Sequence, residues 1–220
     1  MPALSLISKT YEGILAIYPL ESTAITLEGR SNTVYAVIFS PGGKLVAPAS
    51  GDQAVKLWDP ATGSLPKMLS GHPGPVEVIT FPPDSKLVAS ASGDRTVMLW
   101  DSTTGSSLQV LEGHSSVVRT VIFSPNGKLA ASASDYQTDS TTGSPLQIPE
   151  GHSGGVNAVI FSLSGKLVAS ASRDQTVRLW DPTTGSLLQT LEICSDPGTE
   201  AYTSLSIAFS PDSKLVASAS

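Results

Sequence analysis

Short runs in which apolar and polar residues alternate recur along the chain and predict β-strands. The first run has the pattern Val-x-x-Val-x-Phe in three of the five copies, and a turn ending in Lys follows it. Next come Leu-Val-Ala-Ser-Ala-Ser, a second turn, Thr-Val-x-Leu-Trp and a Thr-Thr-Gly turn before a fourth apolar run. Short apolar runs separated by turn residues at this spacing are typical of antiparallel strands. The pattern therefore predicts an all-β fold with four strands in each unit.

The runs form a sequence repeat with about five copies. Their phenylalanines are spaced 42, 42, 38 and 48 residues apart, at Phe39, Phe81, Phe123, Phe161 and Phe209. Between residues 86–105 and 166–185, sixteen of twenty positions are identical. A four-stranded sheet cannot bury both faces alone, so we expect a radial array of small sheets packed on their neighbours. The predicted units are approximately 29–70, 71–112, 113–150, 151–192 and 193–220.

The third unit lacks part of its third strand, because Thr138 is followed at once by Asp139 where other units have Val-x-Leu-Trp. Two interpretations are open. Residues 135–138 form a stub of strand in which Tyr136 covers part of the area of the missing Trp, or the gap reflects a damaged or mis-spliced gene. A buried Trp covers ~200 Å² and contributes up to ~5 kcal/mol. We therefore expect unit three to be the weakest of the array.

Composition narrows the classes of function. The formal net charge is −6 and the sequence has no run of Lys or Arg, which argues against nucleic-acid and anionic-membrane partners. The single cysteine, Cys194, excludes an intrachain disulfide and a cysteine-built metal site, and it suits a reducing compartment. No apolar run is long enough to span a bilayer, and the N-terminus lacks the basic segment of a secretory signal. We expect a soluble, cytoplasmic protein.

Two units supply a histidine, a serine and an aspartate, the residue types of a catalytic triad, together with a tryptophan. The sets are His72, Ser90, Asp94 and Trp100 in unit two and His152, Ser170, Asp174 and Trp180 in unit four. A catalytic triad occurs once, with an exposed serine beside an oxyanion hole. Because this set recurs at the repeat spacing, it favours a structural role. We expect no catalytic residue, no metal site and no cofactor.

Gly-His at the start of a unit and Trp-Asp at the end of its third strand resemble the tryptophan–aspartate (WD) repeat of β-propellers, over residues 27–220. The near-identity of the units resembles the WD arrays of fungal NACHT-type NTPases. The resemblance implies that His, Ser, Asp and Trp form a hydrogen-bonded network in each blade. Unit one retains Asp52 and Trp58, with Arg30 and Pro48 in place of His and Ser. Unit three retains His114 and Ser132.

The resemblance leaves two architectures open. Residues 1–28 form an N-terminal segment before the propeller domain at 29–220. Within it, 14–18 and 23–28 resemble degenerate third and fourth strands. They could complete a blade with 204–220 and close a five-blade ring. The alternative is an open arc of a larger propeller, with the chain as a fragment.

By the same resemblance, partner contacts lie on the face of the Gly-His loops. The residues near the start of the first strands are Tyr35, Glu77, Arg119 and Asn157, and Arg173 precedes the network aspartate of unit four. Asp135 holds the matching position of unit three, before Tyr136. The alternative is that these are only solvated loop residues. The predicted function is a non-catalytic scaffold or recognition module that binds other proteins, as part of a larger NACHT-type signalling protein. Alternatives are an adaptor in a defined complex such as that of mitochondrial division, a non-functional fragment, or a propeller enzyme subunit.

Overall fold

A computed structural model describes residues 32–135, 151–193 and 206–219, together with the backbone of four short strands at 15–17, 25–27, 142–143 and 146–147. The described residues form strands and turns only, which confirms the all-β prediction. Among them no helix is long and apolar enough to cross a membrane.

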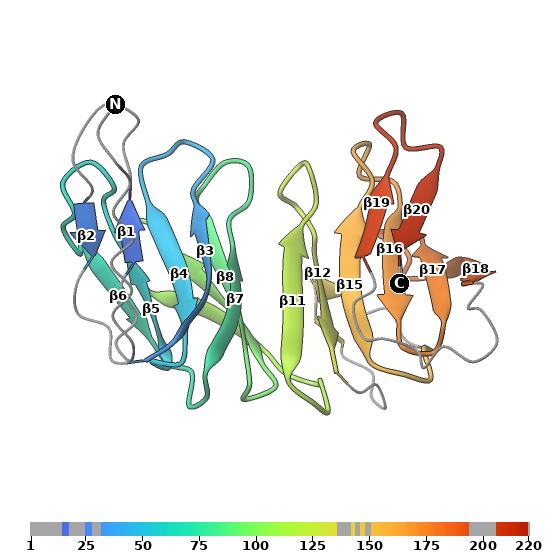
Figure 1. Cartoon of the computed structure of the whole chain (residues 1–220), viewed down its shortest axis with the longest axis horizontal. Coiled ribbons are helices and arrows are strands. Elements are labelled where there is room, and N and C mark those ends of the chain that lie inside the picture. Colours follow the sequence, from blue (N-terminus) through green and yellow to red (C-terminus); the bar gives the residue numbers. More distant parts are fainter. Residues whose placement is uncertain are drawn as a thin grey trace, which may run out of the picture.

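Units two and four each form a complete antiparallel sheet of four strands (Figure 1). Unit two consists of β7 (Val76–Thr80), β8 (Leu87–Ser92), β9 (Val97–Asp101) and β10 (Ser107–Leu111). Unit four consists of β15 (Val156–Phe161), β16 (Val168–Ser172), β17 (Thr176–Trp180) and β18 (Leu187–Glu192). In both sheets the strands lie in the order of the sequence, so each unit is a meander of hairpins.

Unit one departs from this arrangement at Pro48. Its strands are β3 (Val34–Phe39), β4 (Val46–Ser50), β5 (Ala54–Leu57) and β6 (Lys67–Ser70). They form two separate pairs, β3–β4 and β5–β6, which a single bridge between Val46 and Trp58 joins. In unit two, Ser90 pairs with Met98 in the β8–β9 ladder. Pro48 stands at the position of Ser90 and has no N–H to donate, so the corresponding pair with Lys56 does not form.

Unit three departs from the antiparallel prediction. Its strands are β11 (Val118–Phe123), β12 (Ala130–Ser134), β13 (Thr142–Gly143) and β14 (Leu146–Gln147), in the order β11-β12-β14-β13. β14 runs parallel to β12, with Ala130 opposite Leu146. The four missing residues remove the strand that would return beside β12, so a later segment takes its place. The predicted stub lies mostly outside the described residues, as does Tyr136.

The sheets stand side by side in an open arc (Figure 1). β1 (Leu15–Ile17) pairs only with β2 (Ile25–Leu27), at one end of the arc. β19 (Ser206–Phe209) pairs only with β20 (Val216–Ala219), at the other end. Among the described strands no ladder joins these two pairs. The described strands thus agree with the open arc, and among them no sheet combines strands from both ends of the chain.

Apolar residues between neighbouring sheets make the core. Val76, Ile79 and Phe81 of one sheet pack against Ala47 and Ala49 of the sheet before it. The same arrangement recurs between units two and three, three and four, and four and five. Small alanines on the second strand allow the next sheet to approach closely. This stacking places the starts of the first strands along one rim of the arc and their phenylalanines along the opposite rim.

Candidate functional site

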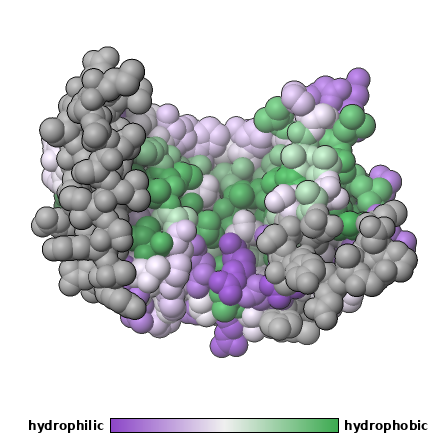
Figure 2. Space-filling model, viewed as in Figure 1, coloured by the Kyte–Doolittle hydropathy of each residue, from purple (hydrophilic) through white to green (hydrophobic). Residues whose placement is uncertain are grey.

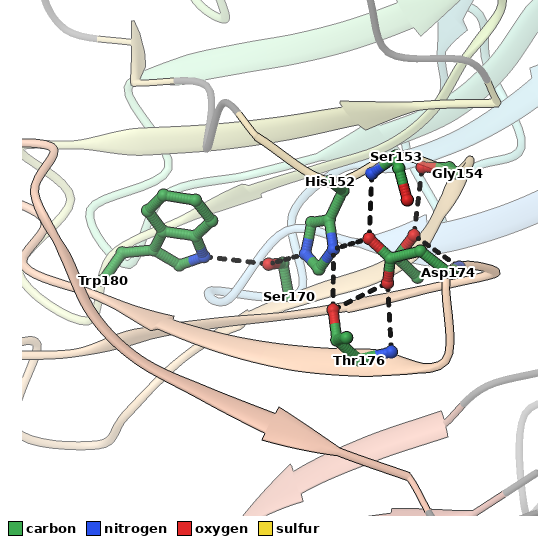
Figure 3. A network of polar contacts seen from close by, with 8 residues as sticks. His152, Ser153, Gly154, Ser170, Asp174, Thr176 and Trp180 are labelled. Atoms are coloured by element: carbon green, nitrogen blue, oxygen red, sulfur yellow. Dashed lines mark hydrogen bonds and ion pairs between the residues drawn. The ribbon is translucent and has the colours of Figure 1, made fainter.

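His152, Ser170, Asp174 and Trp180 of unit four form one buried network of hydrogen bonds (Figure 3). The Trp180 indole N–H donates to Ser170 Oγ at 2.8 Å, Ser170 Oγ lies 2.7 Å from His152 Nε2, and His152 Nδ1 lies 2.8 Å from Asp174 Oδ2. Unit two repeats this network from Trp100 to Asp94 with distances of 2.8, 2.8 and 2.7 Å. The network ties the Gly-His loop to the second and third strands of its own sheet.

The surroundings of His152 and Asp174 determine which of these two side chains carries a charge. Burial lowers the pKa of His152, so the ring is neutral, and its Nδ1–H donates to Asp174 while Nε2 accepts from Ser170. Burial alone would raise the pKa of Asp174. Hydrogen bonds from Thr176 and His152 and from the backbone N–H of Ser153 outweigh burial and lower the pKa to about 2. The carboxylate is therefore charged, and both of its oxygens accept hydrogen bonds.

Sequence reasoning missed one member of the network, the threonine two residues after the aspartate. Thr176 donates from its hydroxyl to Asp174 Oδ1 at 2.6 Å, and Thr96 makes the same bond to Asp94 at 2.6 Å. The signal was present, because both complete units have Asp-x-Thr, whereas unit one has Ala54 at the position of the threonine. Ser90 and Ser170 are fully buried, and their oxygens are already bonded on two sides. These serines are therefore not placed as nucleophiles.

The incomplete units retain parts of the network. The buried indole N–H of Trp58 has no hydrogen-bond partner, because Pro48 has no hydroxyl, and Asp52 instead pairs with Lys56 at 3.0 Å. His114 Nε2 lies 2.8 Å from Ser132 Oγ. Burial lowers the pKa of His114 to about 4. The positions of Arg30 and Tyr136 lie outside the described residues.

Four of the five residues assigned to the partner face lie in one chain of polar contacts across three units. Arg119 on β11 donates from Nη1 to Glu77 on β7 and from Nε to Asp135, both at 2.8 Å. Arg173, in the turn after β16, lies 3.9 Å from Asp135 and donates to Asn157 Oδ1 at 3.3 Å. Tyr35 is half-exposed on β3 and is not part of this chain.

We call Glu77, Arg119, Asp135, Asn157 and Arg173 the ion-pair face. Its two arginines are more exposed (47% and 41% of the side chain) than its two carboxylates (18% and 15%). The acids thus orient the guanidinium groups from beneath, and the outer surface presents N–H donors. Figure 2 shows hydrophilic residues gathered along the rim of the arc where β11 starts. Asp135, which joins units three and four, was named from the sequence only by its position.

Comparison with known families supports the repeat. Residues 21–59, 63–101, 105–139 and 143–181 match the family model described as WD domain, G-beta repeat. These segments together span more than half of the chain. A search of curated proteins found no match.

Proposed function

Because the chain belongs to the WD-repeat family, whose repeats generally mediate protein–protein interactions, we propose that it is a protein-binding module that engages its partner through the ion-pair face. The observation that carries the proposal is the contact chain Glu77–Arg119–Asp135–Arg173, which crosses three units at the surface. It presents two oriented guanidinium groups on a rigid scaffold. Preorganised arginine is enriched among the residues that dominate binding energy at protein interfaces.

The arginines of the ion-pair face should contribute more to the free energy of binding than to the free energy of unfolding. Exposed ion pairs typically contribute ~0–1 kcal/mol to folding. A residue that dominates an interface, which is often an arginine, contributes at least ~2 kcal/mol to binding, or about 30-fold in affinity. Removal of both arginines should therefore abolish partner binding while the sheets stay folded.

The experiment is affinity capture with the full chain as bait, followed by binding measurements on each captured protein. Wild type is compared with the double variant Arg119→Ala and Arg173→Ala. The matched control is Lys67→Ala with Arg95→Ala, which removes the same charge from the outer strand β6 and from a turn of unit two. We expect at least one protein that binds directly to wild type and control and binds the double variant more than ~30-fold more weakly.

Equal binding of all three chains would place the interface elsewhere. Thermal unfolding followed by Trp fluorescence shows whether the double variant is folded, so that a lost partner is not confused with a lost fold. If no captured protein binds the purified chain directly, the module proposal itself is wrong.

The finer proposal is that the chain serves as the recognition part of a larger NACHT-type signalling protein in the cytoplasm. The near-identity of units two and four supports it. Transcript sequencing beyond the codon for Ser220 and upstream of Met1 tests it. An adjoining nucleoside-triphosphatase domain in the same reading frame is the expected result, and a transcript that encodes these residues alone would contradict it.

A further inference from the structure

An apolar groove of about 500 Å³ lies at the other end of the first strands, away from the ion-pair face. Phe81, Phe123 and Phe161 occupy the same position in three consecutive units and line it together with Ile122 and Ile160. Its volume falls within the range of ~300–1,000 Å³ typical of ligand sites. Figure 2 shows that hydrophobic residues gather on the inner face of the arc. The groove could therefore hold two or three aliphatic or aromatic side chains.

The turns beside this groove carry a row of lysines. The turn that joins the first and second strands ends in an exposed lysine in every unit, at Lys44, Lys86, Lys128, Lys166 and Lys214. In three of these turns the lysine has no acidic residue beside it, whereas Asp84 and Asp212 accompany the other two. Pro83 and Pro125 line the groove, and each lies three residues before a lysine of the row.

Contacts between the turns make the row continuous. The turn glycine of unit three, Gly127, packs against Pro83 of unit two, and Gly165 of unit four packs against Pro125 of unit three. The Ser164 backbone N–H of unit four donates to Ser213 Oγ of unit five at 3.3 Å. Turns whose lysines are about forty residues apart in the sequence thus lie next to one another beside the groove, in a chain whose net charge is −6.

The first strands also leave backbone groups facing inward. β7, β11 and β15 are each the edge strand of their sheet. An edge strand has N–H and C=O groups along its outer side that a bound peptide in an extended conformation can pair with. Apolar lining, a cationic rim and strand edges occur together at this one place.

We infer that the groove binds an acidic segment of a partner protein that carries aliphatic or aromatic anchor residues. The carboxylates of such a segment face the lysine rim, and its apolar residues enter the groove between Phe81, Phe123 and Phe161. A nucleic acid is a less suitable occupant, because it has no aliphatic side chains for the groove and the whole chain is acidic.

This site is independent of the proposed function. Arg119 lies at the start of β11 and Phe123 at its end, which separates the two faces by ~13 Å along the strand. The two sites can therefore be tested by different substitutions in the same protein.

The test is fluorescence anisotropy with a labelled peptide of about 12 residues that repeats Glu-Leu-Asp-Phe and spans ~40 Å when extended. Two comparison peptides carry Lys in place of the acids or Ser in place of the apolar residues. We expect the acidic apolar peptide to bind in a salt-sensitive manner, and the comparison peptides to bind at least ~10-fold more weakly.

Variants locate the site. Lys128→Gln with Lys166→Gln should weaken binding at least ~10-fold, whereas Lys67→Gln with Arg95→Gln, which makes the same change in net charge elsewhere, should change it less than ~3-fold. Thr80 lines the groove, so Thr80→Glu should weaken binding at least ~10-fold and its neutral control Thr80→Gln much less. Arg119→Ala with Arg173→Ala should leave this binding unchanged even if it abolishes binding at the ion-pair face.

Several results would overturn the inference. They are no saturation below ~1 mM peptide, equal binding of the lysine-containing or serine-containing peptide, and equal loss in the Lys67 and Arg95 control. Tighter binding of a single-stranded DNA of matched length would assign the lysine row to nucleic acid instead.

Discussion

Substitution of Pro48 by serine should stabilise the protein, because it supplies two groups that unit one lacks. The buried indole N–H of Trp58 has no partner, whereas that of Trp100 donates to Ser90 Oγ at 2.8 Å. Pro48 also lacks the backbone N–H through which Ser90 pairs with Met98 in the β8–β9 ladder. A serine at this position provides a hydroxyl acceptor and a backbone donor in the same step.

The expected gain follows from both groups. A buried unsatisfied donor costs ~1–3 kcal/mol, and an added ladder hydrogen bond contributes ~1 kcal/mol. Loss of proline makes the unfolded chain more flexible and offsets ~0.4–1 kcal/mol. Unit one has Arg30 where unit two has His72, so the new hydroxyl lacks its usual acceptor and the gain stays at the lower end. We expect an increase of ~1–2 kcal/mol in the free energy of unfolding, or roughly 2–8 °C in Tm.

The assay compares Pro48→Ser with Pro48→Ala by urea unfolding and by native-state hydrogen exchange at the β4 and β5 amides. Alanine restores the N–H but offers no acceptor, so the excess of serine over alanine measures the bond to Trp58. That excess should disappear when Trp58→Phe is present in both, as in a double-mutant cycle. If serine and alanine stabilise equally, or if the excess survives Trp58→Phe, the orphaned indole is not the cause and the reasoning is refuted.

Three further predictions concern the other networks and the gap. Burial lowers the pKa of His114 from 6.5 to about 4. The contribution of the neutral His114 ring to the free energy of unfolding is therefore complete above pH 6.5 and falls by up to ~3 kcal/mol as the pH drops toward 4. In urea unfolding from pH 7 to 4, His114→Gln should lose less stability than wild type, and equal losses would contradict this. Asp174→Asn should cost ~2–3 kcal/mol in urea unfolding, because Asp174 accepts from Thr176, His152 and Ser153, whereas Asp181→Asn in an exposed turn should cost less than ~1 kcal/mol. Insertion of Val-Arg-Leu-Trp between Thr138 and Asp139 should stabilise unit three by several kcal/mol, up to ~5 from the Trp alone. Limited proteolysis should cut the wild type first in unit three and the insertion variant elsewhere. An unchanged cleavage site would show that the gap is not the weak point.

Pairing within a unit could be predicted from the sequence because it depends on local pattern. Val76 to Phe81 and Leu87 to Ser92 alternate on either side of a short turn, so their antiparallel register follows from the chain between them. The disruption at Pro48 could also be anticipated, because the loss of a donor is a property of one residue. These features need no knowledge of distant segments.

Pairings and contacts that the local pattern does not determine could not be predicted in the same way. The parallel pairing of β12 with β14 arises because the missing residues leave an open edge, and any nearby segment of suitable length can occupy it. Whether β1 and β2 pair with β19 and β20 depends on the accumulated rotation of the stacked sheets, which no local pattern encodes. The link from Arg119 to both Glu77 and Asp135 likewise depends on side-chain placement across two interfaces.

The two ends of the sheets differ in periodicity, and this difference bears on what each can distinguish. At the groove, Phe81, Phe123 and Phe161 repeat one residue type, so a ligand displaced by one unit meets the same contacts with nearly the same free energy. At the opposite end, Glu77, Arg119 and Asn157 differ in charge at one repeated position. A displaced ligand there meets a like charge or an unpaired group, which costs affinity and selects one register. If both proposals hold, the groove tolerates many acidic segments and the ion-pair face determines which partner binds.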